Sequence, residues 1–231
     1  ERTSSVYDAA GQQVVSISPL GYRSTMIYDA AGQLTDSIDA LSHTTQYGYD
    51  AAGQQIVSIN PLGNRTTSVY DSVGRVEATI NPLGEISTTV YDAAGQAIAS
   101  INALGYRTTS SYDPVGQVVA VEDADNQVST TVYDAVGQTI ATVNPLLDRT
   151  TLGYDAAGNQ TLTVNPVGAR TTTLFDAADR PVVSINPLGD RVTTTYDVIG
   201  QPVATENANQ QVTTTLYDPV GRVQATIDAL Q

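Results

Sequence analysis

An aromatic residue recurs at every twenty-first position along the whole chain, and this period constrains the fold more than any other feature. The chain has 231 residues, which is eleven periods. The residues at this position, which we number as phase 1 of the repeat, are Tyr7, Tyr28, Tyr49, Tyr70, Tyr91, Tyr112, Tyr133, Tyr154, Phe175, Tyr196 and Tyr217. Fixed periods of this length indicate repeat architectures, in which each unit is stabilised by its neighbours. The sequence therefore predicts one continuous array over residues 1–231. Because Gln231 closes the phase that Glu1 opens, we expect it to be a segment of a longer protein.

Each repeat contains two turn signals. The first begins with Asp at phase 2 and reaches Gly at phase 5, as in residues 92–95, and the second runs from Asn or Asp at phase 12 to Gly at phase 15, as in residues 60–63. An Asx acceptor followed three residues later by Gly favours a type I turn that ends in a left-handed residue. The predicted turn-capping residues at phase 2 are Asp8, Asp29, Asp50, Asp71, Asp92, Asp113, Asp134, Asp155, Asp176, Asp197 and Asp218.

The segments between the turns predict β-strands. They are about six residues long, phase 11 is Ile or Val in nine of eleven repeats, and phases 18 to 20 are Ser or Thr in 28 of 33 positions. No segment has the length or the periodicity of a helix. The fold class is therefore all-β, an array of eleven antiparallel β-hairpins with one hairpin in each period. Because open twisted sheets rarely extend past roughly ten strands, we expect the array to coil into a spiral or solenoid-like roll in which each turn covers the one before.

The predicted core consists of the aromatic residue at phase 1, the β-branched residue at phase 11 and the Leu at phase 14, such as Leu62, Leu83 and Leu104. Phases 11, 14, 15 and 17 also change together in repeats six and ten, where Glu122 and Glu206 occupy phase 11. One interpretation is a single contact set in which an Arg stem at phase 17 lies over Ile and Leu. The other is that the two repeats descend from one duplicated ancestor.

Composition excludes several classes of function. The formal net charge is −14, all ten basic residues are Arg, and cysteine is absent. Nucleic acid and anionic membranes need clustered Lys and Arg, so neither is an expected partner. The absence of cysteine excludes thiol chemistry and thiolate metal sites. No apolar run approaches the roughly 20 residues of a membrane span, so no membrane insertion is expected in this segment.

Catalysis is not expected either. The single histidine, His43, lies in a variant turn without a neighbouring nucleophile, and almost every other feature occurs ten or eleven times, whereas an active site is a singular arrangement. The sequence predicts no catalytic, cofactor-binding or metal-binding residues. The ladder of phase-2 Asp residues permits calcium binding, but turn capping already explains Asp at that place.

Two further surface interpretations concern sugars. Aromatic rings stack on carbohydrate, although a ladder of Tyr is also what an array needs for packing. Asn64 and Asn159 match the Asn-x-Thr acceptor pattern for N-glycosylation.

The string GYRTTSSYDPVGQVV, residues 105–119, resembles the YD repeat, also called the Rhs repeat. The resemblance extends over the whole chain. It implies a spiralling β-hairpin array as found in bacterial Rhs toxins, in shell-forming subunits of insecticidal toxin complexes and in teneurins, where the spiral can enclose a hollow. The chain departs from the toxin members in its constant period and in lacking a closing core segment and a non-repetitive C-terminal domain.

Together these features predict a structural, non-enzymatic β-hairpin segment of an extracellular or cell-surface fibre, of bacterial origin. Its expected partners are its own neighbouring repeats and further copies in a filament. The alternatives are a wall segment of a hollow Rhs-type shell that encloses a toxin or other cargo, and an adhesion or carbohydrate-binding module with glycans as partners.

Overall fold

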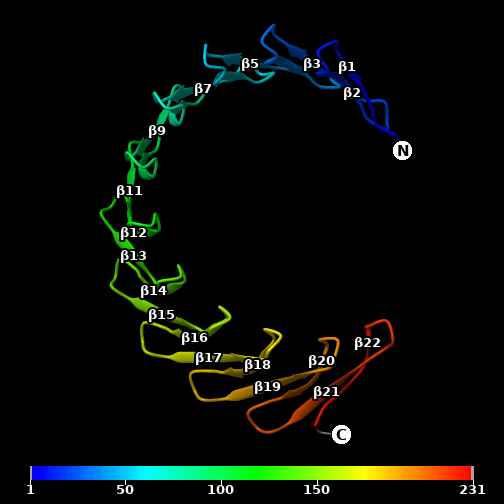
Figure 1. Ribbon diagram of the computed structural model, residues 1–231, viewed down its shortest axis with the longest axis vertical. Helices are drawn as coiled ribbons and strands as arrows, with labels where there is room; N and C mark the ends of the chain where they lie inside the picture. Colours follow the sequence, from blue (N-terminus) through cyan, green and yellow to red (C-terminus); the bar gives the residue numbers. More distant parts are fainter. Residues whose placement is uncertain (1, 230–231) are drawn as a thin grey trace. The chain divides into compact units, whose positions relative to one another are not determined.

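The computed structural model describes residues 2–229, and all regular structure in this range is β-strand (Figure 1). The strands are β1 Ser4–Tyr7, β2 Gln13–Ile17, β3 Arg23–Tyr28, β4 Leu34–Ile38, β5 Thr44–Tyr49, β6 Gln55–Ile59, β7 Arg65–Tyr70, β8 Val76–Ile80, β9 Ile86–Tyr91, β10 Ala97–Ile101, β11 Arg107–Tyr112, β12 Val118–Glu122, β13 Val128–Tyr133, β14 Thr139–Val143, β15 Arg149–Tyr154, β16 Gln160–Val164, β17 Arg170–Phe175, β18 Pro181–Ile185, β19 Arg191–Tyr196, β20 Pro202–Glu206, β21 Val212–Tyr217 and β22 Val223–Ile227. Glu1 and Gln231, on which the expectation of matching end phases depends, lie outside the described residues.

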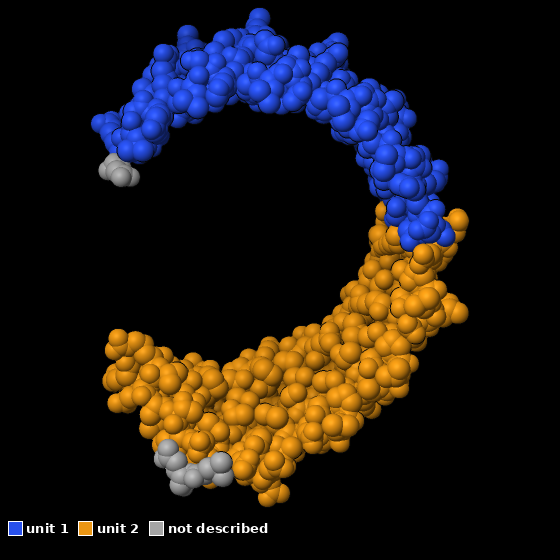
Figure 2. Space-filling view, turned by 180° about the vertical axis from the view of Figure 1, so that it is seen from behind, with its two compact units in different colours: residues 1–110, 123–125 blue, residues 111–122, 126–231 orange. Residues whose placement is uncertain are grey.

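The chain forms two compact units (Figure 2). Unit 1 comprises residues 1–110 and 123–125, and unit 2 comprises residues 111–122 and 126–231. Unit 1 carries β1 to β10, and each of these strands pairs antiparallel with the next. Unit 2 carries β12 to β22, paired in the same way. The predicted all-β class of antiparallel hairpin repeats is confirmed.

Both turns of the repeat have one geometry. In residues 60–64 the N–H of Gly63 donates to the carbonyl of Asn60 at 2.9 Å, and the N–H of Asn60 donates to the carbonyl of Asn64 at 3.0 Å. Gly63 has a φ of 79°, in the left-handed region where Gly carries no steric penalty. The sequence predicted this closure, a type I turn followed by a left-handed residue.

A β-bulge lies beside the aromatic residue in repeats one to five and seven to eleven. In the pairing of β1 with β2, Tyr7 faces Gln13 whereas Val6 faces Val15, so one extra residue is inserted in β2. In two repeats the residue facing the aromatic ring is proline, for example Pro181 opposite Phe175. Proline has no N–H to give to a ladder, and a bulge is one of the few places in a sheet that tolerates it.

The core is thin, because each unit is built from strands that contact only their sequence neighbours among the described elements. Alternating residues therefore face opposite sides of one layer. The buried apolar side chains in residues 2–229 are Val15, Ala99, Ala141 and Val183, all at phase 9. Within a unit, no described hairpin covers another, so the expected overlap of successive turns does not occur over five consecutive repeats.

The prediction that the phase-14 Leu belongs to the core is wrong. Leu62, Leu83 and Leu104 are 75–85% exposed. They lie at the tips of the second turns, beyond the ends of the strands, and no second layer covers them within their units. No helix in the described range is long and apolar enough to cross a membrane.

Two cross-strand pairs on the apolar face combine a glycine with a large residue. Where phase 21 is Gly, the residue opposite is large, as in Gly48 facing Val57 and Gly153 facing Leu162. A Cβ atom built on Gly153 would lie 3.1 Å from the Cβ of Leu162, closer than ordinary packing allows. Facing pairs of this kind are the units that stabilise a single-layer sheet.

Candidate functional site: the contacts that link successive repeats

The phase-2 Asp closes its own turn with backbone hydrogen bonds. In all eleven repeats Oδ1 accepts the N–H of the phase-6 residue at 2.8–3.1 Å. In most repeats it also accepts the N–H of phase 4, as from Ala52 to Asp50 at 2.9 Å. These donors stabilise the charged carboxylate. For Asp155, the N–H of Asn159 is the largest cause of a pKa below the usual value.

The phase-1 Tyr joins its repeat to the one before. Its hydroxyl donates to the phase-7 carbonyl of the preceding repeat, at 2.9–3.1 Å from Tyr28, Tyr49, Tyr70, Tyr91, Tyr133, Tyr154, Tyr196 and Tyr217. Burial raises the pKa of Tyr49 above that of a free phenol. Phe175 cannot make this hydrogen bond, so the junction between repeats eight and nine lacks it.

The phase-6 side chain joins its repeat to the next one. This position is always Gln, Arg or Asn, each of which carries N–H donors on a side chain. Gln12 Nε2 donates to the carbonyl of Gly32 at 2.9 Å. Where no bond is formed the amide still lies against the next turn, because a Cβ built on Gly74 would be 2.8 Å from Gln54 Nε2. The phase-5 Gly thus allows a close approach as well as a positive φ.

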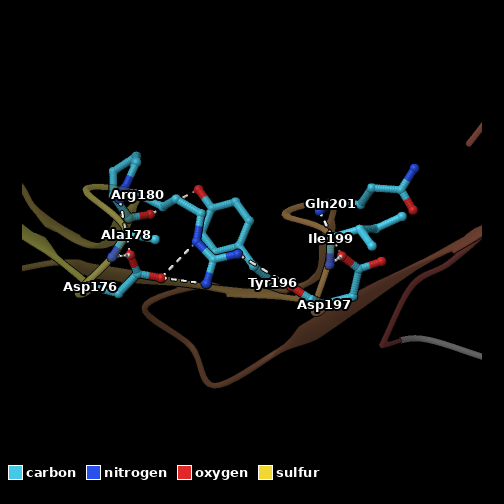
Figure 3. A network of polar contacts seen from close by, with 8 residues as sticks. Asp176, Ala178, Arg180, Tyr196, Asp197, Ile199 and Gln201 are labelled. Atoms are coloured by element: carbon cyan, nitrogen blue, oxygen red, sulfur yellow. Dashed lines mark hydrogen bonds and ion pairs between the residues drawn. The ribbon is translucent and has the colours of Figure 1, made fainter.

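Arginine at phase 6 makes the most extensive link (Figure 3). Arg180 forms an ion pair with Asp176 in its own turn, with an Nη2 to Oδ2 distance of 2.6 Å. Its guanidinium lies 4.7 Å from the ring centroid of Tyr196 in the next repeat, and its Nη1 donates to the carbonyl of Asp197 at 3.3 Å. Arg75 repeats the arrangement, 4.4 Å from the ring centroid of Tyr91. We call these contacts of the phase-6 side chain the inter-repeat clamp.

One junction uses a substitute pair. Asn159, one methylene shorter than Gln, occupies phase 6, and Asp179 replaces the Gly of the following turn. Asn159 Nδ2 donates to Asp179 Oδ1 at 2.7 Å and to Asp155 Oδ2 at 3.3 Å. Asp179 has a φ of 58°, a conformation that Asp tolerates better than most residues. Asn159 is too short to reach the backbone of the next repeat, and the side chain of Asp179 extends toward it, so the two side chains together form the contact that Gln and the turn backbone form elsewhere.

The two predicted glycosylation acceptors differ in their surroundings. Asn159 is half-buried and its Nδ2 makes the two hydrogen bonds described above. A glycan on that nitrogen would remove at least one of them. Asn64 is exposed at the end of a second turn, where its backbone N–H donates to Asn60 Oδ1 at 3.0 Å. Asn64 is therefore the accessible acceptor of the two.

The remaining candidates do not form a cluster. His43 Nδ1 lies 3.0 Å from Asp39 Oδ2 on the surface of its own turn, and both side chains are about half exposed. In residues 2–229 no three Asp, Glu or His side chains lie together at metal-binding spacing. A hollow of about 870 Å³ lies between repeats six and seven in unit 2, lined by Asp113, Gln117, Thr131 and Tyr133 among others. Asp113 and Gln117 are the phase-2 and phase-6 residues of repeat six, and Tyr133 is the phase-1 residue of repeat seven. The hollow is therefore lined by residue types that recur at every junction.

Sequence reasoning missed the clamp and its phase-6 residues. The signal was present, because phase 6 never holds a residue without side-chain N–H donors. The groups that this side chain contacts belong to the following repeat, about twenty residues further along the chain. They come close to it only when the hairpins pair, so the sequence alone does not show the contact.

The correlated changes in repeats six and ten are explained in part. Phases 11 and 17 face each other across the strands, as Ile59 faces Arg65 and Glu122 faces Val128. In repeats six and ten the charged residue is at phase 11 and the apolar residue is at phase 17, the reverse of Ile59 and Arg65. The exposed phase-14 residue does not join this pair.

Comparison with known proteins gives a family and remote structural neighbours. The family model described as RHS Repeat matches residues 7–40, 28–59, 49–86, 91–128 and 133–171. No curated protein sequence matches the chain. A crystal structure of TcdB2-TccC3 is 15% identical over 98% of this chain and 18% of that chain, with a TM-score of 0.46.

Two further structures are more distant. The Tc holotoxin pore of Photorhabdus luminescens is 13% identical over 98% of this chain and 18% of that chain, with a TM-score of 0.39. A porin-like protein from Bacteroides uniformis is 14% identical over 98% of this chain and 92% of that chain, with a TM-score of 0.20. The chain spans 18% of the toxin chains to which it is similar. Because the family model matches well over half of its residues, in register with the aromatic period, the chain belongs to the RHS repeat family.

Proposed function

We propose that the chain is a structural, non-enzymatic segment of an extracellular or cell-surface fibre of a bacterium. The observation that carries the proposal is the repetition of one set of contacts at successive junctions. The Tyr hydroxyl bond and the capped Asp turn recur in both units. A junction that can be repeated without change lets an array extend by addition of further hairpins, which is what a fibre requires.

The charge of the chain supports the same role. A net charge of −14 over 231 residues keeps a long β-structure soluble and opposes side-by-side association of sheets. The clusters of basic residues that bind nucleic acid or anionic lipid are absent from the sequence. No residue pair described above has the nucleophile and base geometry of an active site, so the proposed role is mechanical.

A second candidate is a wall segment of a hollow shell, and the difference between the two sheet faces favours it. One face carries the pairs of phases 11 and 17, such as Ile59 with Arg65, and the other carries Ser and Thr pairs such as Ser58 with Thr66. A wall that separates cargo from solvent requires two different faces. Tc toxin structures are among the neighbours, but at TM-scores that carry no weight for this chain.

Electron microscopy of the full-length gene product tests the proposal. A fibre predicts uniform filaments with a regular axial period. Closed hollow particles would reject the fibre and support the shell. The same material, treated with glycosidase and analysed by mass spectrometry, shows whether Asn64 carries a glycan, as a surface-exposed fibre of a glycosylating organism would.

A further inference from the structure

One hairpin in unit 1 departs from the repeat on its apolar face. In the other ten repeats the residue at phase 9 is apolar and the residue at phase 19 is Ser or Thr, whereas β4 has Asp36 and β5 has Gln46 at these positions (Figure 1). The two residues face each other across the strands, and Gln46 Nε2 donates to Asp36 Oδ1 at 3.2 Å. The pair occurs once among the repeats, and a specific site is a singular arrangement.

Asp36 occupies an unfavourable position for a carboxylate without a cation beside it. Phase 9 contains the four buried side chains of the described range, and Asp36 is itself half-buried. Its neighbours on the adjoining strands are Ile27 and Gln46. No Arg or His in residues 2–229 forms an ion pair with it. A carboxylate that is partly removed from water loses solvation unless it is paired, so Asp36 has a cost that the apolar residues at this phase do not.

A missing side chain leaves a hollow beside this pair. Phase 21 of β5 is Gly48, and a hollow of about 360 Å³ above it is lined by Asp36, Gln46, Val57 and Ile59 among others. A Cβ built on Gly48 would lie 3.4 Å from the Cβ of Val57, which is ordinary contact, and Gly48 does not have a positive φ. Neither packing nor the backbone therefore requires glycine here. The glycine keeps open a space with a carboxylate and an amide on one side and aliphatic groups on the other.

The other glycine at phase 21 provides an internal comparison. Gly153 faces Leu162, which is larger than Val57. The residues that correspond to Asp36 and Gln46 are Ala141 and Thr151, which face each other in the same way. The polar pair and the space over a glycine thus occur together in one hairpin alone.

From this combination we propose that the hollow over Gly48 binds a primary ammonium group on an aliphatic chain. The bond between Gln46 and Asp36 leaves Asp36 Oδ2 and Gln46 Oε1 without a hydrogen-bond partner in residues 2–229, so the spare capacity of the pair is mainly that of acceptors. An ammonium group has three donors and no acceptor. Its charge pairs with Asp36, and its methylene groups lie over Gly48 against Val57 and Ile59. The net charge of −14 also attracts cations.

Two other cations fit the hollow less well. Calcium takes six to eight oxygen ligands, and no three Asp, Glu or His side chains in residues 2–229 lie together at metal-binding spacing. A guanidinium binds a carboxylate best through both oxygens, and Asp36 Oδ1 already accepts from Gln46. A compact ammonium group needs only the free oxygens. Both a lysine side chain of a partner protein and a free alkylamine carry this group.

Titration followed by NMR tests the proposal through the side-chain amide resonances of Gln46. The probe is 1-aminopentane, which should give a saturable shift. The neutral 1-pentanol has the same chain without the charge, and tetramethylammonium has the charge without N–H donors, so neither should saturate. Nα-acetyl-lysine methylamide and 1,5-diaminopentane distinguish the two sources: tighter binding of the first indicates a lysine of a partner protein, and tighter binding of the second a free amine.

One pair of variants tests the charge. Asp36→Asn keeps the shape of the side chain and an oxygen for Gln46 but removes the negative charge, and should weaken binding of 1-aminopentane at least about tenfold, as expected when a charged hydrogen bond is lost. Asp92→Asn is the matched control, because it removes the same charge from a turn of another repeat in unit 1. It should bind like the unaltered chain.

A third variant tests the space. Gly48→Val fills the hollow without changing the carboxylate and should abolish the saturable shift. The sheet admits this substitution, since Val6 faces Val15 at the same two phases in repeat one. Circular dichroism of every variant verifies the β-structure.

Three results would overturn the inference: equal shifts with 1-aminopentane and 1-pentanol, undiminished binding by Asp36→Asn, or undiminished binding by Gly48→Val. The inference goes beyond the proposed fibre and does not depend on it. Absence of amine binding would leave the fibre intact, and hollow particles in the electron microscope would leave the amine site intact.

Discussion

At the scale of single residues, the left-handed position of each turn is usually Gly, and a residue with a side chain at that position has an energetic cost. Gly occupies sixteen of the described positions, and Ser42, Asn126, Leu147, Asp179 and Gln210 occupy the others with φ between 58° and 66°. For a residue with a Cβ this conformation costs roughly 1–2 kcal/mol. Asn and Asp recover part of that cost through local hydrogen bonds. Leu has no such group, so Leu147 is the position with most to gain.

We expect Leu147→Gly to stabilise the protein by about 1 kcal/mol, because it removes backbone strain and little packing, since Leu147 is 83% exposed. The readout is the midpoint of thermal or urea unfolding. Leu146→Gly is the control, as Leu146 is similarly exposed but does not have a positive φ. It should destabilise slightly through added freedom of the unfolded chain. Equal effects of the two substitutions would contradict the strain argument.

Phe175 is the one phase-1 residue without a hydroxyl. Phe175→Tyr should add the hydrogen bond to the carbonyl of Gln160 that other repeats possess, and should stabilise by about 1 kcal/mol. Tyr154→Phe is the reverse substitution in the preceding repeat. It deletes the 2.9 Å hydrogen bond from the Tyr154 hydroxyl to the carbonyl of Thr139 and should destabilise by a similar amount. Denaturant midpoints of both variants measure the effects. If Phe175→Tyr destabilises, the ring of repeat nine lies in a site that does not admit the hydroxyl.

At the scale of elements, each hairpin is specified by its own sequence, and the link between hairpins is specified by pairs of residues in different repeats. The exchange at Asn159 and Asp179 illustrates this, because neither residue fits the consensus of its position and the two contact each other at 2.7 Å. The Asx and Gly turn signals, and the short segments rich in Ile, Val, Ser and Thr between them, were sufficient to predict the hairpins. The clamp required knowledge of which turn lies beside which.

A double-mutant cycle measures that link. Asn159→Gln alone places a longer side chain against Asp179, and Asp179→Gly alone leaves Asn159 too short to reach the next turn. Asn159→Gln should be destabilised, and Asp179→Gly should gain less stability than relief of its positive φ alone would give, because the hydrogen bond is lost. The double variant recreates the Gln and Gly pair of residues 12 and 32. The coupling energy should be about 1 kcal/mol, in the range for residues in direct contact. Additive changes in unfolding midpoint would show that the two positions are independent.

At the scale of the whole molecule, four phase-2 carboxylates, those of Asp71, Asp155, Asp176 and Asp218, make stability depend on pH. The N–H of Arg75 is the largest cause that lowers the pKa of Asp71, and the side chain of Arg180 is the largest cause that lowers the pKa of Asp176. The pKa values of Asp155 and Asp218 are lowered by similar donors. A carboxyl with a lower pKa in the folded state contributes stability above its unfolded pKa of about 4. That contribution is lost as the pH falls through the folded value.

We therefore expect the thermal midpoint to fall as the pH is lowered from 5 toward 2. Protonation also reduces the net negative charge, which acts in the opposite direction, so a variant must separate the two effects. Asp176→Asn keeps an oxygen for the backbone donors, as Asn does in the second turns, but removes the titrating group. Its midpoint should depend less on pH than that of the unaltered protein. Identical pH profiles would show that the ion pair with Arg180 contributes nothing measurable, as is common for exposed pairs.

The sequence by itself determined the hairpins, their turns and the family. All of these depend on residues within one repeat of one another, and backbone conformation responds to such local signals. Only the tertiary structure decided what is buried and what holds one repeat to the next. Leu62 has an apolar side chain typical of a core residue but lies exposed at a turn tip, because burial depends on whether another layer covers a side chain. Gln12 has a polar side chain typical of a surface residue but donates to the carbonyl of Gly32 in the next repeat, because pairing of the hairpins brings together residues of successive repeats.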